Sequence, residues 1–156
     1  MLKLLSQKKV KENWEKYRTH IETAMTSSEG GLLVSEGPKD IYKSIFEMLM
    51  NPFNQSMHLW SEGDEDYIVL TKLQMCGFTE IKSLVLFSST RTKDVDKDLL
   101  DERYYEAYKS ISKFARDNKC VGMYCYSDLD YFAEMAKKTK EWTKVITRYQ
   151  FYFPLD

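Results

Sequence analysis

The sequence predicts an α/β fold in which a single mixed β-sheet is flanked by helices. Three strand-like runs follow one another in the middle of the chain, and helix and strand patterns then alternate to its end. With 156 residues, of which 43% are hydrophobic, the chain is long enough to bury most of its apolar surface. We therefore expect one domain over residues 1–156, with a helical part at 1–52 and a sheet core with two helices at 57–153.

The first third of the chain carries two amphipathic helical patterns. Apolar residues recur at spacings of three and four from Val10 to Ala24, which predicts a helix over residues 8–27. A second pattern, between Pro38 and Pro52, predicts another helix whose end is set by the second proline. Core packing is the simpler interpretation of the first apolar stripe, and a seam for a partner helix is the alternative.

The strand-like runs are Met57–Trp60, Asp66–Cys76 and Ile81–Ser88. Glycine and acidic residues between the first two runs are typical of a hairpin. The segment Leu84–Phe87 is apolar on both faces of the predicted strand, which indicates a strand in the middle of a sheet that is covered on both sides.

Helix and strand patterns alternate in the last third. We expect a helix at about 101–119, a strand at Val121–Tyr126, a helix at Asp128–Lys140 and a strand at Val145–Phe153. The helix at 101–119 gives room for a right-handed crossover, which allows the strands on either side of it to pair in parallel.

Composition excludes several classes of protein. The 23 basic and 24 acidic residues leave a net charge of −1, which argues against a nucleic-acid partner. The apolar runs are too short to span a bilayer, so no membrane partner is expected. The first residues are not followed by the apolar core and cleavage site of a signal peptide, so we expect no signal peptide. Three cysteines, an odd number without dense spacing, fit reduced thiols. We therefore expect a cytoplasmic protein.

No metal site is expected. Three aspartates alternate from Asp94 to Asp98, as at the start of a calcium loop. That loop needs glycine at its sixth position and glutamate at its twelfth, where this chain has Leu99 and Tyr105. Neither of the two histidines has a second ligand at zinc spacing.

The order of elements resembles the GCN5-related N-acetyltransferase (GNAT) superfamily, and in more detail the shorter GNAT-like proteins of tailed bacteriophages. The segments that carry the resemblance include "DIYKSIFEMLM", "DYIVLTKLQ", "YYEAYKSISKFARDNKCVGMYCYS" and "EWTKVITRYQFYFPL". The resemblance runs from about Lys8 to Leu155. It implies a GNAT-like fold, acetyl-CoA as the cofactor, an amine as the acetyl acceptor, and a place in the host cytoplasm or the virion.

The cofactor loop of that family is the point where this chain departs from it. The family has a glycine-rich turn between its fourth strand and third helix, whose backbone N–H groups hold the coenzyme A pyrophosphate. Here the sequence has no glycine from Phe78 to Lys119, and the aspartates that follow would repel phosphate. Within the polar stretch from Ser88 to Leu100, which we expect to be a loop, the candidate cofactor contacts are Ser88, Ser89, Thr90, Arg91 and Lys93.

The resemblance also points to a general acid. The family uses a tyrosine near its fourth helix to reprotonate the leaving thiolate, and Tyr131 matches that position. A solvated tyrosine on a helix surface is the alternative interpretation. A general base is not identified, since Glu80 precedes the third strand-like run and Asp128 follows the strand at 121–126.

Three functions are consistent with these patterns. The first is transfer of an acetyl group from acetyl-CoA to a small amine or a protein lysine. The second is a non-catalytic phage-type protein that keeps the fold and binds partners, such as virion proteins. The third is a host-directed inhibitor. The chain could also form a homo-oligomer.

Overall fold

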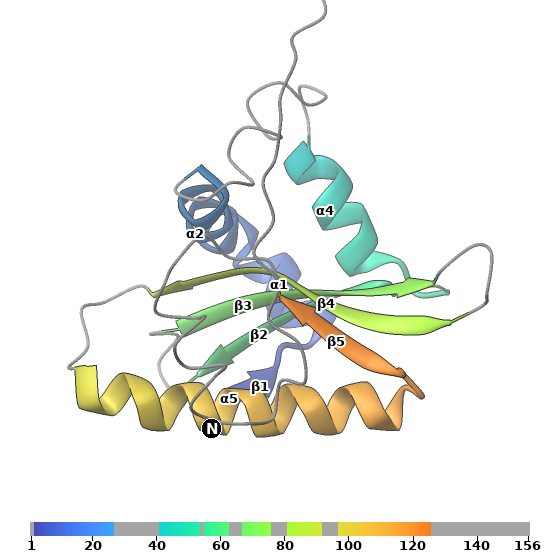
Figure 1. The fold of residues 1–156 in the computed structure, drawn as a ribbon. Helices are drawn as coiled ribbons and strands as arrows, with labels where there is room; N and C mark the ends of the chain where they lie inside the picture. Colours follow the sequence, from blue (N-terminus) through green and yellow to red (C-terminus); the bar gives the residue numbers. More distant parts are fainter. Residues whose placement is uncertain are drawn as a thin grey trace, which may run out of the picture.

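The computed structural model describes residues 2–26, 41–53, 55–62, 67–75, 81–91 and 97–125. These residues form a five-stranded sheet with helices on both faces, which confirms the predicted fold class (Figure 1). The elements are β1 (Leu2–Leu4), α1 (Gln7–Glu12), α2 (Trp14–Thr26), α4 (Ile41–Met50), β2 (Met57–Glu62), β3 (Tyr67–Met75), β4 (Lys82–Arg91), α5 (Lys97–Asp117) and β5 (Gly122–Cys125). No helix in this part of the chain is both long and apolar enough to cross a membrane.

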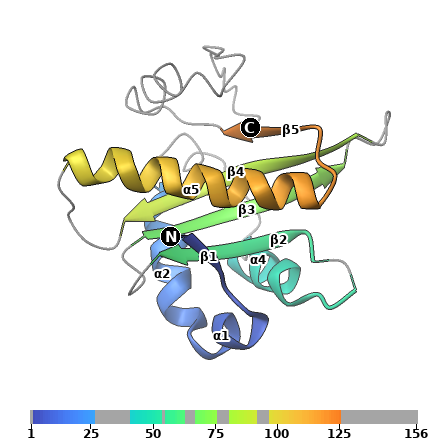
Figure 2. The same ribbon diagram turned by 90° about the horizontal axis from the view of Figure 1, so that it is seen from below.

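The strands lie in the order β1-β2-β3-β4-β5. The first four pair antiparallel with their neighbours, whereas β5 pairs in parallel with β4. Helix α5 makes the crossover between these two strands and lies across one face of the sheet (Figure 2). The mixed sheet and the parallel pairing were both predicted from the helix that separates the two strand patterns.

The N-terminal strand was not predicted. Leu2, Lys3 and Leu4 pair with Glu62, Ser61 and Trp60 at the edge of the sheet. Three residues are too few for an alternating pattern to stand out in a sequence, and the pairing depends on a partner strand more than fifty residues away.

The first helical pattern is divided into two helices. Ser6 caps α1 by accepting a hydrogen bond from the Lys9 N–H at 3.3 Å. Asn13 then interrupts the helix with a φ of −121°, and its side-chain amide donates to the Lys9 carbonyl at 3.0 Å. The prediction of one continuous helix at 8–27 was therefore wrong, since α1 and α2 are separate helices. Its apolar stripe packs as predicted, since Val10, Tyr17 and Ile21 are buried.

The sheet is covered on both faces, and each face has its own hydrophobic core. Helices α1, α2 and α4 cover one face, where the buried residues are Leu5, Val10, Tyr17, Ile21, Ile45, Leu49, Met57, Leu59, Ile68 and Leu70. Helix α5 covers the opposite face, where they are Leu2, Trp60, Val69, Leu84, Ala107, Ile111 and Ala115 (Figure 1). Residues on β2 and β3 alternate between the two cores, as the pleat of a strand requires.

Candidate functional site

Strand β4 pairs with a strand on each side. Its antiparallel pairing with β3 runs from Lys82, opposite Met75, to Arg91, opposite Tyr67. Its parallel pairing with β5 is described from Ser83 to Leu86, which lies opposite Cys125, the last residue that the structure describes.

The register of β4 shifts at the same place. Thr71 of β3 pairs with Leu86, and the preceding Leu70 pairs with Ser88, so that Phe87 is an extra residue. Such a β-bulge leaves one residue outside the hydrogen-bonded ladder and increases the local twist. The backbone of β4 is thus irregular directly after Leu86, the residue that pairs with Cys125 of β5.

Four of the five candidate cofactor residues lie in this last part of β4. Ser88, Ser89, Thr90 and Arg91 pair with Leu70, Val69, Ile68 and Tyr67 of β3. The prediction that a loop begins at Ser88 was wrong, because β3 is long enough to keep pairing with this polar segment. Lys93 lies outside the described residues, and contact of any of the five with phosphate stays a prediction.

Helix α5 begins at Lys97, before the expected start at about Asp101. Asp98, Asp101 and Glu102 therefore fall in its first two turns. Carboxylates at such positions generally stabilise a helix, because its N-terminal end carries a partial positive charge.

The candidate acid and base residues are not placed by the structure. Tyr131, Glu80 and Asp128 all lie outside the described residues, so their roles stay predictions. In the part of the chain that is described, no group of three or more histidine, cysteine or acidic side chains could hold a metal ion.

Sequence reasoning missed a row of buried polar residues between the sheet and α5. His58 of β2 is only 6% exposed, and its ring lies 4.8 Å from that of Phe114 on α5. The Trp60 ring lies 5.1 Å from the same phenylalanine, and its indole N–H donates to the Thr71 hydroxyl at 2.9 Å. The sequence signal was present, because His58 and Trp60 alternate on a strand and so share a face.

His58 is neutral in this setting. Burial, together with the positive charge of Lys82, lowers the pKa of its imidazole to about 4. Its Nδ1 is buried and has no hydrogen-bond partner among the described residues. Because His58 is buried between the sheet and Phe114 of α5, we assign it to the core and not to the candidate site.

Comparison with known proteins identifies the fold. No protein-family model and no curated protein sequence matches the chain. An aminoglycoside acetyltransferase from an uncultured soil metagenomic sample, solved with sisomicin, is similar over 100% of this chain and 96% of its own, with a TM-score of 0.64 and 12% identity. A ribosomal-protein-alanine N-acetyltransferase from Brucella melitensis biovar Abortus 2308 is similar over 100% and 98%, with a TM-score of 0.57 and 9% identity.

A GNAT-family acetyltransferase from Staphylococcus aureus is also similar, over 99% of this chain and 98% of its own. Its TM-score is 0.55 and its sequence identity is 10%. Likeness at such low identity is a likeness of fold, and it agrees with the element order that the sequence predicts. The chain therefore has the fold of the GNAT acetyltransferases.

Proposed function

We propose that the chain transfers an acetyl group from acetyl-CoA to an amine beside the bulge in β4. One observation supports this most directly: Phe87 is an extra residue in the ladder with β3, and it directly follows the part of β4 that pairs in parallel with β5. The similar structures, which are acetyltransferases, also support it.

The bulge suits the chemistry of acyl transfer. When an amine nitrogen attacks a thioester carbonyl, negative charge grows on the carbonyl oxygen, and a fixed N–H donor stabilises that charge. A bulge directs a backbone N–H out of the ladder, so the amide of Phe87 or Ser88 is the expected donor. The C–N bond then forms and the C–S bond breaks. A base takes the proton from the amine nitrogen, and Tyr131 is our candidate to protonate the sulfur.

The residues after the bulge are our candidates for holding the phosphates. Ser88, Ser89, Thr90, Arg91 and Lys93 offer hydroxyl, guanidinium and ammonium donors, and Arg91 could bind a phosphate with two parallel hydrogen bonds. Helix α5 starts soon after them in the chain, at Lys97, and the N-terminus of a helix favours a bound anion. Without glycines in this stretch, we expect binding in the micromolar range.

A second candidate function rests on a different observation. No glycine occurs from Phe78 to Lys119, so the close backbone approach that a pyrophosphate needs is hindered. This favours a phage-type protein that retains the fold without the activity, either associated with the virion or directed at a host protein. Such a protein need not bind coenzyme A, and this difference separates the two candidates.

Isothermal titration with acetyl-CoA and with free coenzyme A is the deciding experiment. We expect micromolar binding by the wild type and at least tenfold weaker binding by Arg91→Ala, since a hydrogen bond between charged groups contributes about 1.5–3 kcal/mol. Arg116→Ala is the matched control, because Arg116 is exposed in the last turn of α5. No heat and no thermal shift at millimolar acetyl-CoA would reject the enzyme. Binding would justify screening amines for acetylated product by mass spectrometry.

A further inference from the structure

A charged pair joins α5 to the sheet. Glu62, the last residue of β2, is buried, and its Oε2 lies 4.0 Å from Nε of Arg103 on α5. A carboxylate that is removed from water is costly unless an opposite charge lies beside it, so Arg103 stabilises Glu62 in this position. The Arg103 side chain is itself 29% exposed, so part of the guanidinium still reaches water.

This pair lies at the end of the sheet where β4 ends. Glu62 pairs with Tyr67 in the ladder of β2 and β3, and Tyr67 pairs with Arg91 in the ladder of β3 and β4. Paired residues on antiparallel strands have Cα atoms about 4.5–5.5 Å apart, so the backbone of Arg91 lies about 10 Å from that of Glu62. Arg91 is one of our candidates for holding the phosphates, so the pair lies close to the proposed cofactor site.

The same pair lies near the N-terminus of α5. Arg103 follows Lys97, the first residue of the helix, by six positions, which is about 9 Å along the helix axis. Figures 1 and 2 both show the start of α5 and the end of β4 on the same side of the sheet. Glu62 therefore ties to the sheet the part of α5 that favours a bound anion.

Farther along α5, the core contacts with the sheet are apolar. Ala107, Ile111 and Ala115 are buried in the core under this helix. The Phe114 ring lies 5.1 Å from that of Trp60. Burial of apolar surface has no preferred direction, whereas the attraction between two charges falls as they move apart. The charged pair is therefore better suited than these apolar contacts to fix the position of α5 along its own axis.

We propose that Glu62 and Arg103 are positioning residues for the cofactor, an inference that rests on the proposed acetyl transfer. By holding α5 against β2, the pair sets the distance between the helix N-terminus and the end of β4, so that both meet the same pyrophosphate. Because no glycine occurs from Phe78 to Lys119, close approach of the backbone to the phosphates is hindered. The placement of Arg91 and of the helix N-terminus then matters more for affinity.

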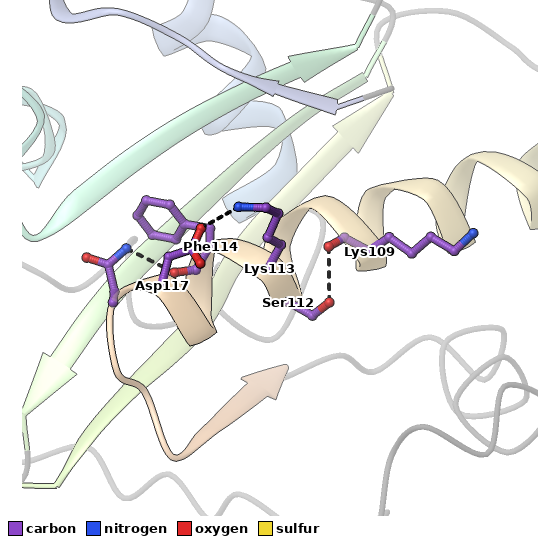
Figure 3. Close-up of polar contacts among 6 residues, drawn as sticks. Lys109, Ser112, Lys113, Phe114 and Asp117 are labelled. Atoms are coloured by element: carbon purple, nitrogen blue, oxygen red, sulfur yellow. Dashed lines mark hydrogen bonds and ion pairs between the residues drawn. The ribbon is translucent and has the colours of Figure 1, made fainter.

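Isothermal titration of Glu62→Gln with acetyl-CoA tests this proposal. Glutamine keeps the shape of the side chain but removes its charge, so we expect about tenfold weaker binding from misplaced phosphate contacts. The remaining Arg103 is partly exposed, so the variant should fold, which circular dichroism can verify. Asp117→Asn is the matched control, because it makes the same change in the exposed pair of Lys113 and Asp117, 2.7 Å apart at the other end of α5 (Figure 3). It should leave the dissociation constant unchanged.

A double variant separates positioning from a purely structural role. In the Arg91→Ala background, Glu62→Gln should weaken binding by no more than about twofold, because the guanidinium that the pair helps to place is already gone. Losses that multiply in the double variant, or a Glu62→Gln protein that binds as tightly as the wild type, would overturn this proposal and leave the proposed acetyl transfer standing. A wild type that binds no acetyl-CoA would reject the acetyl transfer, and the positioning role with it.

Discussion

The two faces of the sheet bury different chemistry. Under α1, α2 and α4 the core is mostly aliphatic, with Tyr17 and the half-buried Trp14 among aliphatic side chains. Under α5 the buried residues include His58, Thr71 and Glu62, and the Glu62 carboxylate lies 4.0 Å from the Arg103 guanidinium of α5. The first face should therefore be stabilised by packing alone, whereas the second should respond to pH and to the loss of single hydrogen bonds.

The largest effect is expected on the aliphatic face. Leu59 of β2 is 1% exposed, and Leu59→Ala leaves a cavity under the helices. Its free energy of unfolding should fall by about 2–5 kcal/mol, as measured by urea denaturation. No titratable group is changed, so the loss should be equal at about pH 7 and about pH 5. A loss that depends on pH would contradict the separation of the two faces.

The α5 face should lose stability in acid through His58. The imidazole titrates at about 4 in the fold, against 6.5 in the unfolded chain. As the pH falls between these values, the unfolded chain takes up a proton that the folded chain does not, so the free energy of unfolding falls by up to about 3 kcal/mol. Above the unfolded value both states are neutral, and the full stability is present.

Replacing the imidazole tests this assignment. His58→Leu should flatten the fall in unfolding free energy between about pH 6.5 and about pH 4, since it removes the titrating group. Leu59→Ala, the adjacent residue on the opposite face, should keep the wild-type slope and so serves as the control. A slope in His58→Leu equal to that of the wild type would show that other groups set the acid response.

The hydrogen bond between Trp60 and Thr71 should make the next largest contribution to the free energy of unfolding. Thr71 is fully buried, and its hydroxyl accepts from the indole N–H at 2.9 Å. Thr71→Val keeps the shape but leaves the N–H unsatisfied, so we expect a loss of about 1–3 kcal/mol. Adding Trp60→Phe removes the orphaned donor, and the double variant should lose less than the sum of the single losses. Strict additivity would mean that the bond is not stabilising.

The burial of apolar residues explains which parts of the fold the sequence could predict. Periodic apolar residues identified the strands Met57–Trp60 and Ile81–Ser88 and the helix before β5, because burial of one face leaves a pattern in the chain. The break at Asn13 and the extension of β4 to Arg91 left no such pattern, since one depends on a local hydrogen bond and the other on the length of β3. For the candidate site, the sequence led us to polar residues after the strand, but the bulge at Phe87 exists only in the register with β3.

The smallest effect is expected at the end of α5. The Cys120 N–H donates to the Ala115 carbonyl and the Lys119 N–H to the Arg116 carbonyl, both at 2.9 Å, while Lys119 has a φ of 61°. This is the left-handed position of a helix C-cap, where glycine avoids the steric cost that a lysine carries. Lys119→Gly should raise the free energy of unfolding by about 0.5–1 kcal/mol.

The control for this change is the same substitution inside the helix. Lys113→Gly should lower the free energy of unfolding by about 1 kcal/mol, because glycine disfavours a helix interior and the pair with Asp117 is lost. If the two substitutions change the free energy of unfolding in opposite directions, the backbone conformation at each position, and not the lost lysine side chain, determines the change in stability. If Lys119→Gly also destabilised the protein, the cap would depend on contacts of that side chain. The face of the sheet under α5 would then be stabilised by one more polar side chain, at the end of that helix.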